Sequence, residues 1–160
     1  MVSALVALTI FGFPGTARAA LSISAAPTAN LGSTATGSSS KSAQLGTVTV
    51  NASGLVAPSF VATVTTTVFT TGAGTANETI QKSSISYWSG PATTATGTLS
   101  VTPGQANAGA AQSLLIPRTA FSAVGLLLSI TVAWNPTLIV NIPTSAVAGT
   151  YTGTITHSVA

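Results

Sequence analysis

Residues 149–159 alternate between two kinds of side chain with a period of two. One parity carries residues expected to face a core, namely Tyr151, Ile155, His157 and Val159. The other parity carries only hydroxyl groups, from Thr150, Thr152, Thr154, Thr156 and Ser158. Successive side chains of a β-strand point to opposite faces, so this pattern predicts a half-buried antiparallel strand at the end of the chain.

The same alternation recurs along the chain, in segments separated by Gly, Pro, Asn and Ser. We expect about nine short strands, at residues 21–25, 45–52, 59–71, 79–88, 96–102, 113–118, 126–134, 138–142 and 149–159. No segment has a sustained helical period. Turn signals roughly every ten residues are typical of an all-β fold, and one apolar and one hydroxylated face per strand favours two packed sheets. The predicted fold class is an antiparallel, Ig-like β-sandwich.

Three segments carry finer expectations. In residues 59–71 the parity of Phe60 and Val64 reaches Thr66, whereas Phe69 has the opposite parity, which predicts a bulge or a change of sheet near Thr66. Glu78 and Lys82 are four apart, which is compatible with a short helical turn. Residues 126–134 place five large side chains on one parity and are expected to form a core strand; these are Leu126, Leu128, Ile130, Val132 and Trp134.

The first nineteen residues resemble an export signal. Residues 4–13 are an apolar run, Pro14-Gly15 interrupts it, and Ala17-Arg18-Ala19 fits an A-x-A cleavage site. We expect a signal peptide at 1–19 and a β-sandwich domain at 20–160, with a flexible loop at about 30–42. The alternative is a membrane anchor, but about ten apolar residues are too few to span a bilayer. No span is expected in the mature chain.

Charged side chains make up only 3% of the chain, against 46% hydrophobic residues. Solubility must therefore depend on Thr, Ser, Asn and Gln, which suits a β protein outside the cytosol. The four cations, Arg18, Lys41, Lys82 and Arg118, are scattered in sequence. The clustered basic residues expected of a nucleic-acid partner are missing from this pattern.

The inventory of reactive side chains argues against catalysis. The sequence has one His, one acidic residue and no Cys, so a carboxylate pair, a conventional triad and a thiolate site cannot be built. His157 with Glu78 could in principle orient a serine, but its parity predicts a structural histidine. Too few ligands exist for a transition metal; calcium held by Glu78 and backbone carbonyls stays open. We expect no catalytic residues, no metal and no cofactor.

Aromatic residues are the candidates for ligand or partner binding. Tyr87 and Trp88 are adjacent, so on a strand they point to opposite faces. Parity with Ile85 places Tyr87 inside and leaves Trp88 exposed, where its ring could stack on a sugar or a partner. The alternative is that Trp88 packs beneath the neighbouring Ser89-Gly90-Pro91 turn.

Two stretches resemble the WxL domain of Gram-positive surface proteins. They are LGTVTVNASG at 45–54 and GTYTGTITHSV at 149–159, with a strand opened by Phe60 between them. The family typically has an LGxVTVTD strand followed by a Trp-x-Leu motif, and ends on GxYxxxLTWxL. Here Phe60-Val61-Ala62 and His157-Ser158-Val159 stand in the places of the two Trp-x-Leu motifs. SYWSGPA at 86–92 is also similar to secreted β-sandwich domains of actinobacteria.

The resemblance implies an exported cell-surface domain. With the missing catalytic groups, it predicts a non-catalytic module that is secreted or associated with the cell wall, where it contacts peptidoglycan or other surface proteins. The alternative is a structural subunit that self-assembles, because uncharged, Thr-rich edge strands offer little protection against strand addition. The oligomeric state is open.

Overall fold

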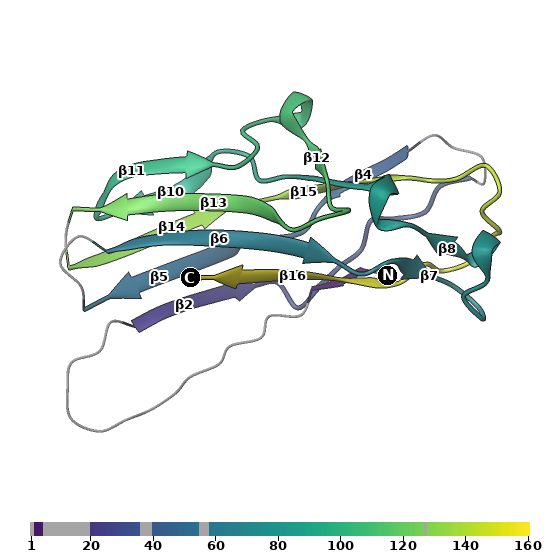
Figure 1. Cartoon of the computed structure of the whole chain (residues 1–160), viewed down its shortest axis with the longest axis horizontal. Coiled ribbons are helices and arrows are strands. Elements are labelled where there is room, and N and C mark those ends of the chain that lie inside the picture. Colours follow the sequence, from purple (N-terminus) through teal and green to yellow (C-terminus); the bar gives the residue numbers. More distant parts are fainter. Residues whose placement is uncertain (1, 5–19, 36–39, 55–57, 127) are drawn as a thin grey trace, which may run out of the picture.

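The chain folds as an all-β protein in the computed structural model, which describes residues 2–4, 20–35, 40–54, 58–126 and 128–160 (Figure 1). Most strands run along the long axis of the molecule. All pairings between the described strands are antiparallel except the one between β1 and β16. The predicted all-β fold class is confirmed.

The largest sheet forms one layer of the molecule. Its strand order is β11 (Thr98–Pro103), β13 (Arg118–Gly125), β6 (Ser59–Thr66), β16 (Gly153–Val159), β1 (Val2–Ala4) and β3 (Thr28–Ala29). Within this order, β16 pairs with β6 on one side and with the short β1 on the other. The last strand of the chain is thus held inside a sheet.

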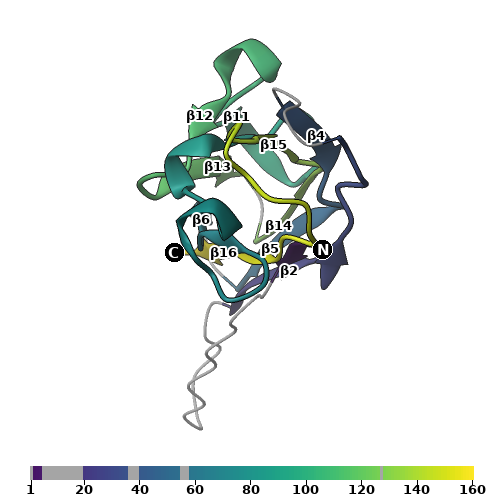
Figure 2. The ribbon, with the colours of Figure 1, turned by 90° about the vertical axis from the view of Figure 1, so that its right-hand side faces the viewer.

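Two four-stranded sheets lie opposite. One has the order β10 (Ala92–Thr96), β14 (Ser129–Trp134), β5 (Val48–Ser53) and β2 (Ala20–Ala25). The other has the order β12 (Gln112–Ser113), β9 (Ile85–Trp88), β15 (Thr137–Asn141) and β4 (Ser40–Gln44). The end-on view shows β13, β6 and β16 on one side of the molecule and β4, β15, β14 and β5 on the other (Figure 2).

Small elements complete the described part. β7 (Phe69–Thr70) and β8 (Thr79–Ile80) pair as a two-stranded sheet. Short 3-10 turns form η1 (Ala76–Glu78), η2 (Lys82–Ser84) and η3 (Ala108–Ala110). The single helical turn expected to hold both Glu78 and Lys82 is not found, because η1 ends at Glu78, η2 begins at Lys82, and β8 lies between them.

The core lies between the layers and takes side chains from every large sheet. Phe60, Phe121 and Ile155 come from the largest sheet, and Trp134 and Leu138 come from the other two. The rings of Phe121 and Trp134 stack at 4.9 Å with an interplanar angle of 20°. This contact joins the two layers through aromatic surface, which contributes more per residue than aliphatic packing.

The closing strand has the predicted two-faced character. Ile155 and His157 are buried, whereas Thr156 is half-buried and Ser158 is exposed on the other face. The predicted break near Thr66 is also confirmed. β6 ends at Thr66 in the largest sheet, and the chain resumes at Phe69 in the small β7–β8 sheet, where Phe69 is buried.

Several stretches differ from the prediction. The strand expected at 113–118 is reduced to β12, which ends at Ser113. β10 was not predicted. The residues from Arg118 to Gly125 form the long strand β13, which the alternation did not reveal beyond Arg118. Leu126 and Leu128, expected in the core, precede β14 and are 66% and 65% exposed. The physical reason is that the chain passes between the layers here, since β13 and β14 belong to different sheets. Leu126 and Leu128 share the parity of Ile130, but they precede the first residue of β14. The alternation in the sequence is therefore longer than the strand itself.

The N-terminal expectations are only partly covered by the described residues. The segment Val2–Ala4 forms β1, and residues 5–19, with the expected cleavage site, lie outside the described part. Of the predicted loop at 30–42, residues 36–39 are likewise not described, and Ser40 already begins β4. The expected edge strand at 21–25 is confirmed as β2, at the edge of its sheet.

Candidate functional site

Three aromatic side chains meet in the core, one from each large sheet. Tyr87 on β9, Trp134 at the end of β14 and His157 on β16 are all at most 1% exposed. The Trp134 Nε1–H donates to Tyr87 Oη at 3.1 Å, and Tyr87 Oη lies 3.1 Å from His157 Nε2. The two pairings tie the three sheets together by hydrogen bonds as well as by packing.

One hydrogen-bond direction in this trio is fixed. The indole N–H can only donate, so Tyr87 Oη accepts from Trp134. In the contact between Tyr87 Oη and His157 Nε2, the donor and acceptor roles depend on the histidine tautomer. His157 Nδ1 is buried and has no hydrogen-bond partner among the described residues. His157 is thus buried, as its parity predicted, but only one of its two ring nitrogens has a hydrogen-bond partner in the described part of the chain.

Burial also sets the acid–base behaviour of the trio. Removal from water lowers the pKa of His157 to about 4, because the charged imidazolium is disfavoured. Burial likewise raises the pKa of Tyr87, and the hydrogen bond from Trp134 only partly opposes this. Both side chains are therefore neutral near pH 7 and closed off from solvent.

The two residues of the predicted binding pair, Tyr87 and Trp88, differ in burial. Tyr87 is fully buried, as its parity predicted, and this removes it from any surface contact with a ligand. Trp88 is half-buried rather than exposed, and a Cβ added at Gly90 would lie 3.4 Å from its ring. The turn after Trp88 is anchored, since Gly90 N–H donates to Gln105 O at 3.0 Å. The Trp88 ring thus lies beside Gly90 in this turn.

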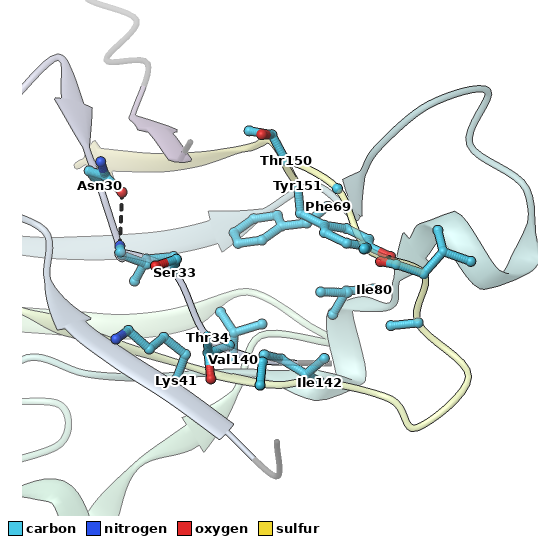
Figure 3. A pocket seen from close by; sticks show the side chains of 17 residues that line it. Asn30, Ser33, Thr34, Lys41, Phe69, Ile80, Val140, Ile142, Thr150 and Tyr151 are labelled. Atoms are coloured by element: carbon cyan, nitrogen blue, oxygen red, sulfur yellow. Dashed lines mark hydrogen bonds between the residues drawn. The ribbon is translucent and has the colours of Figure 1, made fainter. Parts of the chain in front are cut away.

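A cavity of about 640 Å³ lies at the end of the molecule where β7 and β8 are found (Figure 3). Its walls come from residues 30–35, from Lys41, from the ends of β7, β8 and β15, and from residues 146–151. The volume falls within the range of roughly 300–1,000 Å³ typical of small-molecule sites. Neither Tyr87 nor Trp88 lines it.

The apolar wall of this cavity is built from core residues. Phe69, Ile80 and Val140 are at most 5% exposed, and Ile142 continues the same wall just beyond β15. Figure 3 shows Phe69, Ile80 and Ile142 together on one side of the cavity. Phe69 and Ile80 are paired with each other between β7 and β8, and Val140 is fixed in β15, so this part of the wall is preformed.

Among the described residues that line the cavity, Lys41 is the only one with a positively charged side chain. It lies directly opposite Val140 in the β4–β15 pairing, and residues paired in this way share a face of the sheet. The lysine side chain therefore turns toward the inner face beside a buried valine, although β4 is the edge strand of its sheet. In Figure 3 its ammonium lies on the Ser33 side of the cavity, away from Ile80 and Ile142.

The segment at 30–35 shapes the polar side of the cavity. Gly32 N–H donates to Asn30 Oδ1 at 2.8 Å, and Gly32 has φ of 77°, a conformation that favours glycine. A Cβ at Gly32 would lie 3.4 Å from both Cε and Nζ of Lys41, so the end of the lysine packs along this backbone. Because Gly32 has no side chain, the Lys41 ammonium can lie close to the backbone of this turn.

Tyr151 holds in place the part of the cavity wall that residues 146–151 form. Its hydroxyl lies 3.1 Å from the carbonyl oxygens of both Asn77 and Val147, and Val147 N–H also donates to Asn77 O at 3.1 Å. These bonds fasten the loop after β15 to η1. The wall therefore has defined contacts although its residues are largely exposed.

Sequence reasoning did not find this cavity, because Lys41 fell at the end of a Gly, Ser and Thr-rich stretch interpreted as a loop. The signal available was the alternation of Lys41 and Ala43 against the polar residues of 40–44, which β4 reproduces as alternating exposure. Among the described residues, no group of three or more His, Cys, Asp or Glu side chains could hold a metal. No helix in that part of the chain is long and apolar enough to cross a membrane.

Comparisons of the chain with protein-family models, with curated proteins and with solved structures found no match.

Proposed function

We propose that this chain is a non-catalytic module of the bacterial cell surface that binds cell-wall polymer or another surface protein through the cavity around Lys41. The observation that carries the proposal is the composition of that cavity. It combines a preformed apolar wall, a rim of hydroxyl and amide groups, and an inward-facing ammonium. Wall polymers offer hydroxyl and acidic groups, which such a lining can contact.

The distribution of reactive groups supports a binding role. His157, the single histidine of the sequence, is buried and is not among the residues that line the cavity. Glu78, the single acidic residue, is engaged by Thr75, whose N–H and hydroxyl both donate to Glu78 Oε2 at 3.0 and 2.8 Å. The cavity thus has hydroxyls and one ammonium for recognition but no general acid–base pair.

The test is retention of the purified chain on isolated Gram-positive cell walls. We expect Lys41→Gln to reduce retention several-fold and Lys82→Gln, which removes an equal charge outside the cavity, to leave it unchanged. Equal retention of both variants and the unsubstituted chain would show that the Lys41 side of the cavity does not contribute to wall binding. Cell fractionation tests the location separately, because recovery of the chain in the cytosol contradicts export.

A second candidate is self-assembly, favoured by the apolar end of the molecule at the β13–β14 crossing. Leu126 and Leu128 are exposed there, and Leu99 is close, since its neighbour Thr98 pairs with Gly125. Exposed apolar groups of this kind are frequent at contacts between protein chains.

Sedimentation over a concentration series separates the two candidates. If the chain assembles through this end, Leu126→Ser with Leu128→Ser should weaken association. Leu115→Ser with Ile116→Ser, a similarly exposed apolar pair on another loop, should not. A chain that is monomeric at every concentration excludes the assembling subunit.

A further inference from the structure

The chain contains almost no acid with which Lys41 could pair. Glu78 is the only Asp or Glu in the sequence, and both hydrogen bonds to its Oε2 come from Thr75. Hydrogen bonding to Thr75 lowers the pKa of the Glu78 carboxyl and keeps it charged in its own turn. Within the described residues Lys41 has no ion pair, and the composition leaves its counter-ion to be supplied from outside.

The lack of an acidic partner does not by itself make Lys41 a candidate for ligand binding, because Lys82 is also without an acidic partner in the described part of the chain. What distinguishes Lys41 is its surroundings. It shares a sheet face with the buried Val140, it packs along Gly32, and it borders a cavity whose other side is Phe69, Ile80 and Ile142. A positively charged side and an apolar side therefore border the same cavity.

We propose that this cavity binds an amphipathic ligand with one acidic group, which pairs with the Lys41 ammonium while an apolar body covers Phe69, Ile80 and Ile142. The inference deepens the proposed binding function by naming the ligand class. The shared chemistry is a carboxylate, sulfonate or phosphate attached to an acyl or aromatic body. A charge-assisted pair beside an apolar wall is stronger than one in open water, because part of its hydration is removed.

A competing role for Lys41 must be separated in the test. β4 is an edge strand, and an inward-pointing charge on such a strand discourages pairing with a second molecule. In that role Lys41 would alter association and not ligand affinity. The two roles predict different effects of the same substitution.

The experiment uses fluorescence titration of the full chain with 1-anilinonaphthalene-8-sulfonate and with its uncharged counterpart N-phenyl-1-naphthylamine. We expect Lys41→Gln to weaken binding of the sulfonate roughly fivefold, the equivalent of about 1 kcal/mol for an ion pair, and to leave the uncharged dye unaffected. Lys82→Gln is the matched control and should bind both dyes as the unsubstituted chain does. Octanoate should displace the sulfonate at several-fold lower concentration than octanol.

Two results overturn the proposal. One is equal sulfonate affinity of the Lys41→Gln and Lys82→Gln variants, including the case in which Lys41→Gln only increases sedimentation-detected association. The other is displacement by octanol as effective as that by octanoate. Circular dichroism of each variant must first match the unsubstituted chain; if Lys41→Gln fails to fold, Lys41→Met carries the same test.

The outcome is separable from that of the wall-binding proposal. If Lys41→Gln loses wall retention but the chain does not prefer octanoate, the wall-binding function is supported and the proposed ligand class is contradicted. If the chain prefers octanoate but is not retained on walls, the ligand class is supported and the wall-binding function is contradicted.

Discussion

The ring of Phe69 lies against the backbone of Gly153, in the space where any other residue at 153 would place its Cβ. Gly153 opens β16 and Phe69 opens β7, so this contact joins the closing strand to the small sheet that carries the apolar wall of the cavity. Gly153 does not have a positive φ. Its role is therefore close approach and not an unusual backbone conformation.

We predict that Gly153→Ala lowers the free energy of unfolding by roughly 2–3 kcal/mol, because the added methyl group forces Phe69 out of its packed position. Urea denaturation measures this change. Combining Gly153→Ala with Phe69→Leu should recover part of the loss that the two single changes would give if they were additive. Gly109→Ala, in an exposed turn, serves as the control and should change stability by less than about 1 kcal/mol. Strict additivity of the two single changes would contradict the contact.

The hydroxyl of Tyr87 is predicted to matter for stability more than that of Tyr151. Tyr87→Phe leaves Trp134 Nε1–H and His157 Nε2 without their shared partner in the core, at a cost of roughly 2–4 kcal/mol. Tyr151→Phe removes a hydroxyl from two carbonyl oxygens that stay near solvent, so about 1 kcal/mol is expected. Urea denaturation of the two variants under the same conditions gives the comparison, and equal losses would mean that the buried trio is not under hydrogen-bond constraint.

Trp88 is predicted to contribute to stability and not to the cavity. Trp88→Ala removes a half-buried ring that packs beside Gly90, and we expect a loss of roughly 2 kcal/mol in unfolding free energy. Sulfonate binding should be unchanged, because Trp88 does not line the cavity. Selective loss of binding with full stability would restore Trp88 as a ligand contact.

The sequence predicted strands well where alternation is unbroken. In β16 the parity of Ile155 and His157 identified the buried face, and the change of parity between Thr66 and Phe69 marked a real transfer between sheets. β13 was not predicted from the sequence because Ala120 and Phe121 are consecutive and both buried, which breaks the alternation. A register shift between Thr119 and Phe121 places them so, and a bulge of this kind removes the period of two on which the prediction depends.

The cavity could not be predicted for a different reason. The meaning of Lys41 depends on the pairing of β4 with β15, which brings it opposite Val140 from almost a hundred positions away in sequence. Composition near Lys41 indicates a loop, and nothing local specifies the partner strand. The hydrogen-bonded trio is similar in this respect, because parity places Tyr87, Trp134 and His157 inside but does not reveal that they meet.

The pH dependence of stability is expected to depend mainly on His157. In the folded protein its pKa is lowered to about 4, from an ordinary value of 6.5, because burial disfavours the charged ring. Below pH 6.5 the unfolded chain therefore takes up a proton that the folded chain excludes. Stability should be fully present above about pH 6.5 and should fall as the pH decreases toward 4, by roughly 1 kcal/mol per pH unit and roughly 3 kcal/mol in all.

Urea denaturation between pH 4 and 8 tests this dependence. His157→Gln keeps a hydrogen-bonding group opposite Tyr87 but does not titrate, so its unfolding free energy should be nearly independent of pH between 4.5 and 6.5. Glu78 acts in the same direction at lower pH, since its lowered carboxyl pKa means that stability is lost as the pH falls through its titration. Glu78→Gln should therefore retain the slope between pH 4.5 and 6.5. Equal slopes for the His157→Gln variant and the unsubstituted chain in this range would show that the buried imidazole is not the titrating group.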